Sequence, residues 1–306
     1  MNIFLDNVNL SSRSGPNSFG KKIKKEFENT GHSVFSNISE FNSVLPDVQL
    51  SFIAANFKIA PIVQRLDGIY FNSEQDFNSL NAPIEATYQA ADAVIFQSEF
   101  NRSLTAHYFG IKEKSFVIRN GTDLEIINSI DPIKNDNLDN FENVWSCASS
   151  WRPHKRLKDN IGYFLEMSQD SDCLIVAGNN PDHIISHPRI FYAGDLDWDT
   201  LISVYKRSKY FIHLAWLDHC PNVVVDARAS GCHIICSSAG GTKEIAGNNS
   251  TIILEDDWDF TPTRLYKPPS MDFSNSQKSE FLSDINIKNV SDLYLNVLNE
   301  VKNSVG

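Results

Sequence analysis

The chain has 306 residues, of which 42% are hydrophobic and 21% charged, and its formal net charge at pH 7 is −11. This is the composition of a globular protein with enough apolar residues for two modest cores. The acidic balance argues against a nucleic-acid partner, because phosphate binding needs a surplus of lysine and arginine. No run approaches the roughly 20 apolar residues of a transmembrane helix, and the first apolar run is too short for a signal sequence. We therefore expect a cytoplasmic protein, and we leave peripheral membrane contact through a local patch open.

The cysteines favour reduced core thiols over a disulfide framework. Their number, five, is odd, and most of them lie within apolar, strand-like runs. Cys232 and Cys236 lie on either side of His233, but no second pair of ligands with suitable spacing follows them. The sequence thus predicts no metal site.

Apolar runs alternate with amphipathic stretches along the chain, which is typical of parallel sheets covered by helices. In the first part of the chain, strands are expected at 2–7, 48–54, 62–66, 93–97 and 115–118. A loop at 11–19 contains Gly15-Pro16 and precedes a helix at 20–30, which Gly31 ends. A second helix is expected at 98–108.

Residues 120–142 are crowded with aspartate and asparagine, as in an exposed linker, and separate two domains at 1–135 and 136–288. In the second domain, strands are expected at 143–148, 173–177, 190–192, 210–214, 233–236 and 251–254, and helices at 158–168, 199–208 and 222–230. Apolar residues at helical spacing predict a C-terminal helix within 289–306. The expected class is α/β, with two doubly wound parallel sheets facing across a cleft and a ligand site at the carboxyl ends of the strands.

A nucleotide-dependent dehydrogenase would share this class. However, no Gly-x-Gly-x-x-Gly run follows a predicted strand, and the loop after the first strand contains Ser14-Gly15-Pro16-Asn17 instead. Hydride transfer is therefore disfavoured.

The segment 215–236 carries the most chemical information. Pro221-Asn222-Val223 opens a predicted helix, so the free backbone N–H groups there suit an anion such as a diphosphate. Asp226, one turn inside that helix, is placed to accept hydrogen bonds from a ribose diol. Asp218 precedes it by seven intervening residues, in the loop before the helix.

This segment resembles the retaining family 4 glycosyltransferases (glycosyl transferases group 1) of the GT-B fold. Their signature has two glutamates separated by seven residues, at a loop that opens a helix. Asp218 and Asp226 occupy those two positions. Residues 238–245 resemble the family's glycine pair, spacer and Glu-Ile. The resemblance implies two Rossmann-like domains, the N-terminal one on the acceptor side. It also implies that Asp218 lies by the donor sugar and Asp226 by the ribose.

A cationic cluster at 149–157 resembles the family's loop that neutralises the diphosphate, with Arg152 and Lys155 as the cationic pair. Fixed cations stabilise the charge that develops on the leaving group. We interpret the neighbouring Arg156 as a surface residue.

In the first domain, Ser14-Gly15-Pro16 resembles the family's glycine loop near the phosphate. Asp67 follows a buried-looking strand, so it either points into the cleft as a catalytic residue or pairs with Arg65 as a structural ion pair.

The resemblance implies transfer of a hexose from a UDP- or GDP-sugar to a hydroxyl acceptor on a sugar, a lipid-linked glycan or a polysaccharide. It implies retention, with no metal and no cofactor besides the donor. Two alternatives stay open. The aspartates at the glutamate positions and the short first domain would suit an inactive GT-B scaffold or binding subunit. A GT-B nucleotide-sugar epimerase would act on the donor alone.

Overall fold

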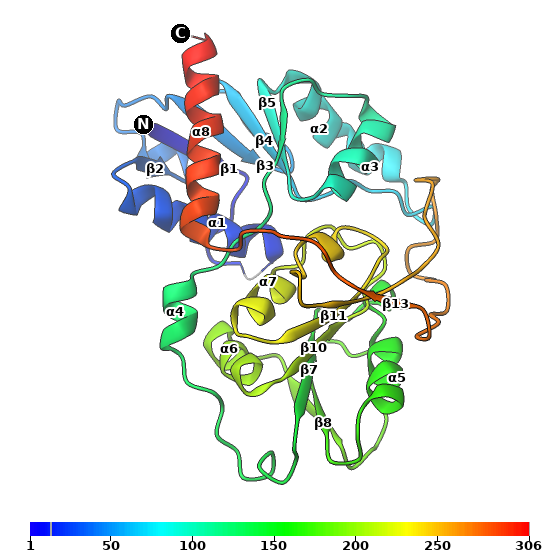
Figure 1. Ribbon diagram of the computed structural model, residues 1–306. Helices are drawn as coiled ribbons and strands as arrows, with labels where there is room; N and C mark the ends of the chain where they lie inside the picture. Colours follow the sequence, from blue (N-terminus) through cyan, green and yellow to red (C-terminus); the bar gives the residue numbers. More distant parts are fainter. Residues whose placement is uncertain (13, 306) are drawn as a thin grey trace. The chain divides into compact units, whose positions relative to one another are not determined.

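The structure is a computed structural model that describes residues 1–12 and 14–305 (Figure 1). The chain forms two compact units. Unit 1 comprises Met1–Asp123, Phe260–Thr263 and the C-terminal stretch from Asp284, and unit 2 comprises Leu124–Asp259 and Arg264–Ser283. Each unit contains a largely parallel sheet, which confirms the predicted α/β class. No helix in the described part of the chain is long and apolar enough to cross a membrane.

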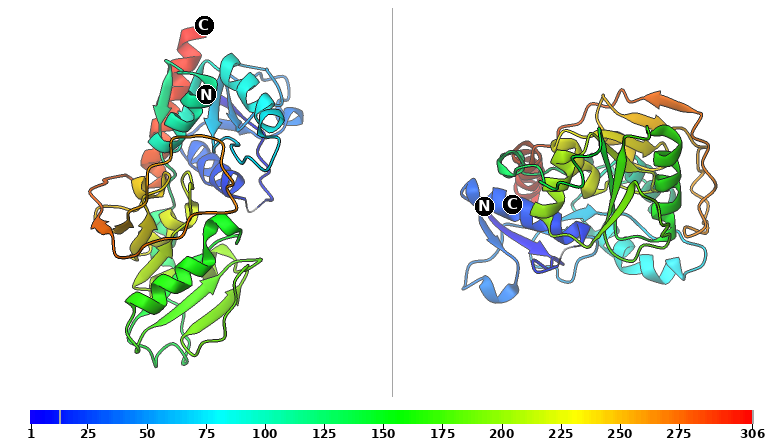
Figure 2. Two further views of the ribbon diagram at one scale, coloured as in Figure 1. Left: turned by 90° about the vertical axis from the view of Figure 1, so that its right-hand side faces the viewer. Right: turned by 90° about the horizontal axis from the view of Figure 1, so that it is seen from below.

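Unit 1 is built on a six-stranded sheet in the order β2-β1-β3-β4-β5-β6, with all neighbouring strands parallel. The strands are β1 (Asn2–Asp6), β2 (Ser33–Phe35), β3 (Val48–Phe52), β4 (Ile62–Leu66), β5 (Ala93–Phe96) and β6 (Ser115–Val117). The helices are α1 (Gly15–Asn29), α2 (Phe77–Ala90), α3 (Glu99–Phe109) and α8 (Ile287–Val305), with a 3-10 turn, η1, at Ile38–Glu40. Helices α1 and α8 pack together and α8 also contacts β3 and β4, whereas α2 and α3 lie against β4 and β5 (Figures 1 and 2).

Two helices of unit 1 differ from the sequence prediction. Helix α1 begins at Gly15, within the predicted loop, because Pro16 lies in its first turn, where a missing N–H breaks no helical hydrogen bond. Helix α2 was not predicted, since it contains Pro83 and many polar residues. Its first turn is capped by the Asp76 carboxylate, which accepts a 3.1 Å hydrogen bond from the Ser79 N–H.

The core of unit 1 closes around the buried cation of Arg65 on β4. Its guanidinium lies over the Phe19 ring at 4.2 Å and donates to the hydroxyl of Tyr294 on α8 at 3.1 Å. It also donates to the Asn120 side chain at 2.8 Å and pairs with Asp67. A fully buried charge is tolerated only with such partners. The C-terminal helix thus completes the core of unit 1.

Unit 2 is built on a seven-stranded sheet in the order β13-β12-β11-β10-β7-β8-β9, in which only β13 runs antiparallel to its neighbour. The strands are β7 (Val144–Ala148), β8 (Cys173–Ala177), β9 (Ile190–Gly194), β10 (Tyr210–His213), β11 (His233–Ser237), β12 (Thr251–Ile253) and β13 (Ser276–Lys278). The helical elements are α4 (Leu124–Ser129), α5 (Leu157–Met167), α6 (Trp198–Arg207) and α7 (Asn222–Ala229), with 3-10 turns η2 (Pro153–Lys155) and η3 (Thr242–Glu244). Helix α5 covers one face of this sheet, and α6 and α7 cover the other (Figures 1 and 2).

The units divide between Asp123 and Leu124, whereas the sequence analysis places the boundary after residue 135. The polar stretch is not a free linker, because it lies along unit 2. The Ile133 N–H donates to the Ser203 carbonyl at 2.9 Å, and Leu138 is buried in a cluster with Val144 and Val204. Residues 284–288, assigned by the sequence analysis to the second domain, belong to unit 1 with α8.

The docking of α8 predicts a local pattern of stability losses. Leu298→Ala should lower the free energy of unfolding by about 2 to 4 kcal/mol, because Leu298 is fully buried against unit 1. Leu293→Ala on the same helix is the control, since Leu293 is 48% exposed and should cost little. Urea unfolding followed by far-ultraviolet circular dichroism measures both. Equal losses in the two variants would contradict this role of α8.

Candidate functional site

The carboxyl ends of β7, β10 and β11 in unit 2 bring the main predicted site residues together. The chain leaves β10 at His213 and reaches α7 at Asn222 through a loop that contains Asp218. Gly240, after β11, packs directly against this loop: a Cβ there would lie 2.6 Å from the Asp218 carbonyl oxygen. The Gly241 N–H donates to that oxygen at 2.7 Å. Only glycine permits this approach, so the predicted acidic signature and glycine pair form one structural unit.

The Asp218 carboxylate is the centre of the site's electrostatics. It forms an ion pair with the Lys155 ammonium, and its Oδ2 lies 3.0 Å from His213 Nε2. Its Oδ1 accepts a 3.0 Å hydrogen bond from the His219 N–H. Burial alone would raise the pKa of Asp218, but the Lys155 charge and the His213 hydrogen bond outweigh burial and hold that pKa well below its usual range. Asp218 is therefore ionised at neutral pH.

The histidines around Asp218 are neutral. Burial lowers the pKa of His213, although Asp218 opposes this shift. Burial also lowers the pKa of His154 to about 3 and that of His219 to about 4. Neutral His213 can donate from Nε2 to the carboxylate, so it orients Asp218 without adding a charge. Sequence analysis missed His213, because it is the last residue of an apolar strand and nothing in its spacing separates it from the core.

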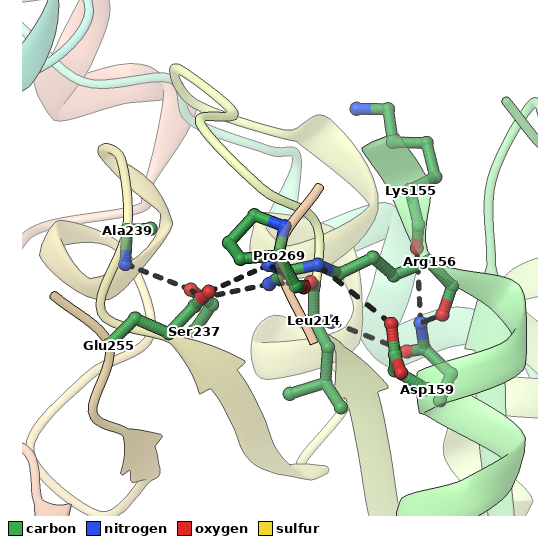
Figure 3. A network of polar contacts seen from close by, with 9 residues as sticks. Lys155, Arg156, Asp159, Leu214, Ser237, Ala239, Glu255 and Pro269 are labelled. Carbon is green, nitrogen blue, oxygen red and sulfur yellow. Dashed lines mark hydrogen bonds and ion pairs between the residues drawn. The ribbon is translucent and has the colours of Figure 1, made fainter. Parts of the chain in front are cut away.

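The three side chains of the cationic cluster differ in their exposure and in their partners. Lys155, in η2, is partly buried and reaches Asp218. Arg152 is exposed, and within the described chain its guanidinium has no carboxylate partner. The prediction that Arg156 lies on the surface is wrong, because the residue is 2% exposed. The left-handed backbone of Arg156 (φ +53°) turns the chain between η2 and α5, and in Figure 3 Lys155 points away from the Arg156 side chain.

Arg156 belongs to a structural network (Figure 3). Its guanidinium bonds Glu255 with two contacts of 2.9 and 2.7 Å and donates to the Pro269 carbonyl at 2.9 Å. The Ser237 hydroxyl donates to the same carboxylate, and the Ala239 N–H donates to Ser237 Oγ at 2.8 Å. This network fixes the end of β11 and the start of the segment that carries Gly240.

Helix α7 begins where the sequence predicts. Pro221 is its N-cap, Asn222 its first residue and Val223 the next, and all three are partly buried. Asp226 is 4% exposed, and its Oδ2 accepts a 2.9 Å hydrogen bond from the Trp198 indole of α6. One carboxylate oxygen of Asp226 thus already accepts a hydrogen bond from within unit 2.

The remaining predicted site residues, Gly15 and Asp67, lie in unit 1. Gly15 is the exposed first residue of α1. Asp67 follows β4 and accepts through Oδ1 from Arg65 and Gln97, so the ion pair that the sequence left open is present. Burial raises the pKa of Asp67, and Arg65 partly offsets the shift. Among residues 1–12 and 14–305, no group of three His, Cys, Asp or Glu side chains is arranged to hold a metal ion.

The charge balance at Asp218 predicts a pH-dependent loss of stability. The pKa of Asp218 is lower in the folded protein than its usual 3.8, so its ionisation stabilises unit 2 above that pH, and this contribution is lost as the pH falls towards the folded value. Asp218→Asn should lower the free energy of unfolding by about 1.5 to 3 kcal/mol at pH 7, and the difference should shrink below about pH 4.

Tryptophan fluorescence during urea unfolding reports this effect selectively, since all five tryptophans lie within the residue ranges of unit 2. Asp257→Asn, at an exposed position of the same unit, is the matched control. A difference between wild type and Asp218→Asn that does not change with pH would contradict the ion pair.

Comparison with known protein families finds a model that matches one segment of the chain. Residues 157–259 match the family model of glycosyl transferases group 1, a segment that contains Asp218, Asp226 and Gly240. No curated protein sequence matches the chain.

Solved structures match over the whole chain. Sucrose-phosphate synthase from Thermosynechococcus elongatus has a TM-score of 0.63 at 11% identity, covering 100% of this chain and 97% of its own. HepE from Anabaena in complex with UDP-glucose has a TM-score of 0.59 at 14% identity, with 100% and 99% covered. The catalytic domain of starch synthase IV from Arabidopsis thaliana, bound to ADP and acarbose, has a TM-score of 0.65 at 10% identity, with 98% and 99% covered. The chain therefore has the GT-B fold of two Rossmann-like domains, and its segment 157–259 matches the group 1 glycosyltransferases that the sequence resembles.

Proposed function

We propose that this chain is a retaining, metal-independent glycosyltransferase of the cytoplasm. It moves a hexose from a UDP- or GDP-sugar to a hydroxyl group of a sugar or glycan acceptor. The observation that carries the proposal is the Lys155–Asp218 ion pair beside the start of α7 and the Gly240 turn. Two of the similar structures, HepE and starch synthase IV, hold UDP-glucose and ADP respectively, which supports a nucleotide-linked donor here.

Lys155 supplies the positive charge that the leaving group needs. As the anomeric C–O bond to the donor phosphate breaks, negative charge grows on the diphosphate, and a fixed ammonium stabilises it more than it stabilises the intact donor. Asp218 holds Lys155 in place, and the exposed Arg152 lies three residues before Lys155 as a second cation. The backbone at Pro221, Asn222 and Val223 contributes the partial positive charge of a helix N-terminus.

The remaining predicted residues have assigned parts in the same reaction. Asp226 binds the ribose hydroxyls, and Asp218 also contacts the donor sugar. In unit 1, the backbone at Gly15 contacts the phosphate, and Asp67 contacts the acceptor. The new C–O bond forms on the face from which the phosphate leaves, and the acceptor's proton passes to the leaving phosphate oxygen. Charge and protons then balance without a metal ion.

Donor turnover tests this proposal. With a panel of UDP-, ADP- and GDP-hexoses, the protein should release one nucleoside diphosphate, with or without chelator. Lys155→Met should lower the rate by about 100-fold or more, by removing the charge that stabilises the transition state. Lys158→Met, at an exposed position on α5, should retain the wild-type rate.

The anomeric configuration of the product, read by proton nuclear magnetic resonance, separates retention from inversion. Nucleotide binding without release of diphosphate from any donor would favour the inactive scaffold. Conversion of the donor sugar to its epimer, with the diphosphate still attached, would favour the epimerase. Loss of turnover with chelator would contradict metal independence.

A further inference from the structure

A pocket lies wholly within unit 1, and none of its described lining residues is among those assigned to the donor. Its volume is about 460 Å³, within the range of roughly 300 to 1,000 Å³ that is usual for small-molecule sites. Its walls come from the segments that follow the carboxyl ends of three neighbouring strands: 7–9 after β1, 36–38 after β2, and 56–57 after β3. In a parallel sheet, this edge is where ligands bind.

The pocket is lined by asparagine amides with spare hydrogen-bonding capacity. The side-chain NH2 group of Asn7 donates hydrogen bonds to the carbonyls of Phe52 and Ala54, at 3.0 Å each. Its Oδ1 therefore remains as an acceptor. Asn9 and Asn37 accept through Oδ1 from nearby serines, which leaves each Nδ2 as a donor. Within the described chain, the side chain of Asn56 makes no hydrogen bond at all. The wall thus offers donors and acceptors together, as hydroxyl groups require.

The pocket also contains an exposed aromatic ring and few charged groups. Phe57 is 43% exposed and lies at the pocket, and its ring is supported by Phe4 with the centroids 6.3 Å apart. Among the described residues that line the pocket there is no lysine or arginine, and their one ionisable group is the buried Asp6. An anionic ligand would find no countercharge among these residues. A flat apolar ring beside paired donors and acceptors suits a molecule with an apolar face and a polar edge.

Asp6 holds the turn at 56–57 in place. Its Oδ2 accepts hydrogen bonds from the Asn56 N–H at 2.8 Å and from Gln49 Nε2 at 3.0 Å. The turn that presents Asn56 and Phe57 is therefore held by its backbone, which leaves the side chains available to a ligand. The pocket is built before any ligand arrives, which lowers the entropic cost of binding.

We propose that this pocket binds a neutral, hydroxyl-rich ring, that is, one sugar residue. Asn56 and Asn37 bond its hydroxyls, and Phe57 packs against the apolar face of the ring. The assignment of this sugar to the acceptor rests on the proposed function, whereas the binding itself does not.

Ligand-detected nuclear magnetic resonance tests the binding without any turnover. The probes are the methyl glycosides of glucose, galactose, mannose and N-acetylglucosamine, with methyl glucuronide as the charged comparator. At least one neutral glycoside should show saturation transfer and a dissociation constant in the millimolar range. Asn56→Leu and Phe57→Ala should each weaken that binding about fivefold or more, the effect of losing one hydrogen bond or one apolar contact.

Matched control variants show whether weaker glycoside binding comes from the lost side-chain contact or from a loss of folded protein. Asn78→Leu replaces an exposed asparagine of α2, and Phe281→Ala removes a ring that is 40% exposed in unit 2. Both should bind the glycoside as wild type does, and circular dichroism should show all four variants folded. Asn56→Leu retains the backbone bond to Asp6, so it should keep the fold even if Phe57→Ala disturbs it.

Nucleotide binding, followed by thermal shift with UDP and GDP, tests the donor site independently of the sugar pocket. Loss of glycoside binding in Asn56→Leu with nucleotide binding unchanged would support the pocket. Absence of binding by every glycoside, preference for the glucuronide, or equal binding by Asn56→Leu and wild type would overturn it, whatever the nucleotide result.

Discussion

A buried carboxylate stays ionised only if nearby groups offset the loss of water around its charge. The site in unit 2 is arranged around one such carboxylate, Asp218. Removing it from water would favour its protonated form. Lys155 and His213 reverse this preference. These partners come from a turn after β7 and from the end of β10, and the backbone of Asp218 is held by Gly241 after β11. One charge therefore fixes three neighbouring strand ends relative to one another, and the start of α7 follows from that arrangement.

The turn at 153–156 directs two adjacent cations to different carboxylates. Lys155 faces Asp218, whereas Arg156, one residue later, is buried with Glu255. The left-handed backbone at Arg156 makes this division possible. Lys155 is a compact charge on a flexible stem and can serve both a carboxylate and an incoming phosphate. Arg156 uses its planar, two-pronged geometry, which suits a permanent pair with a carboxylate. Exchange of the two residue types would leave both sites without the geometry they need.

The sequence predicts most of the sheet framework, because buried parallel strands are short apolar runs: the bounds of β4 and β8 agree with the prediction. It does not predict α2, where Pro83 argues for a break, or β13, which is exposed and polar. The family resemblance implies that Asp218 and Lys155 belong to one site, and the structure pairs the two side chains. Sequence analysis misplaces Arg156 and overlooks His213, because burial and side-chain direction depend on a backbone turn and on strand neighbours that local sequence does not encode.

We propose that the Asp218–Lys155 pair in unit 2 forms the site of a nucleoside diphosphate. A crystal structure with UDP tests it most directly. We expect a diphosphate oxygen within hydrogen-bond distance of Lys155 Nζ, with the Asp218 carboxylate still paired with that ammonium and the phosphates near the first N–H groups of α7. UDP bound elsewhere, with the Asp218–Lys155 pair free of any contact to it, would contradict the account.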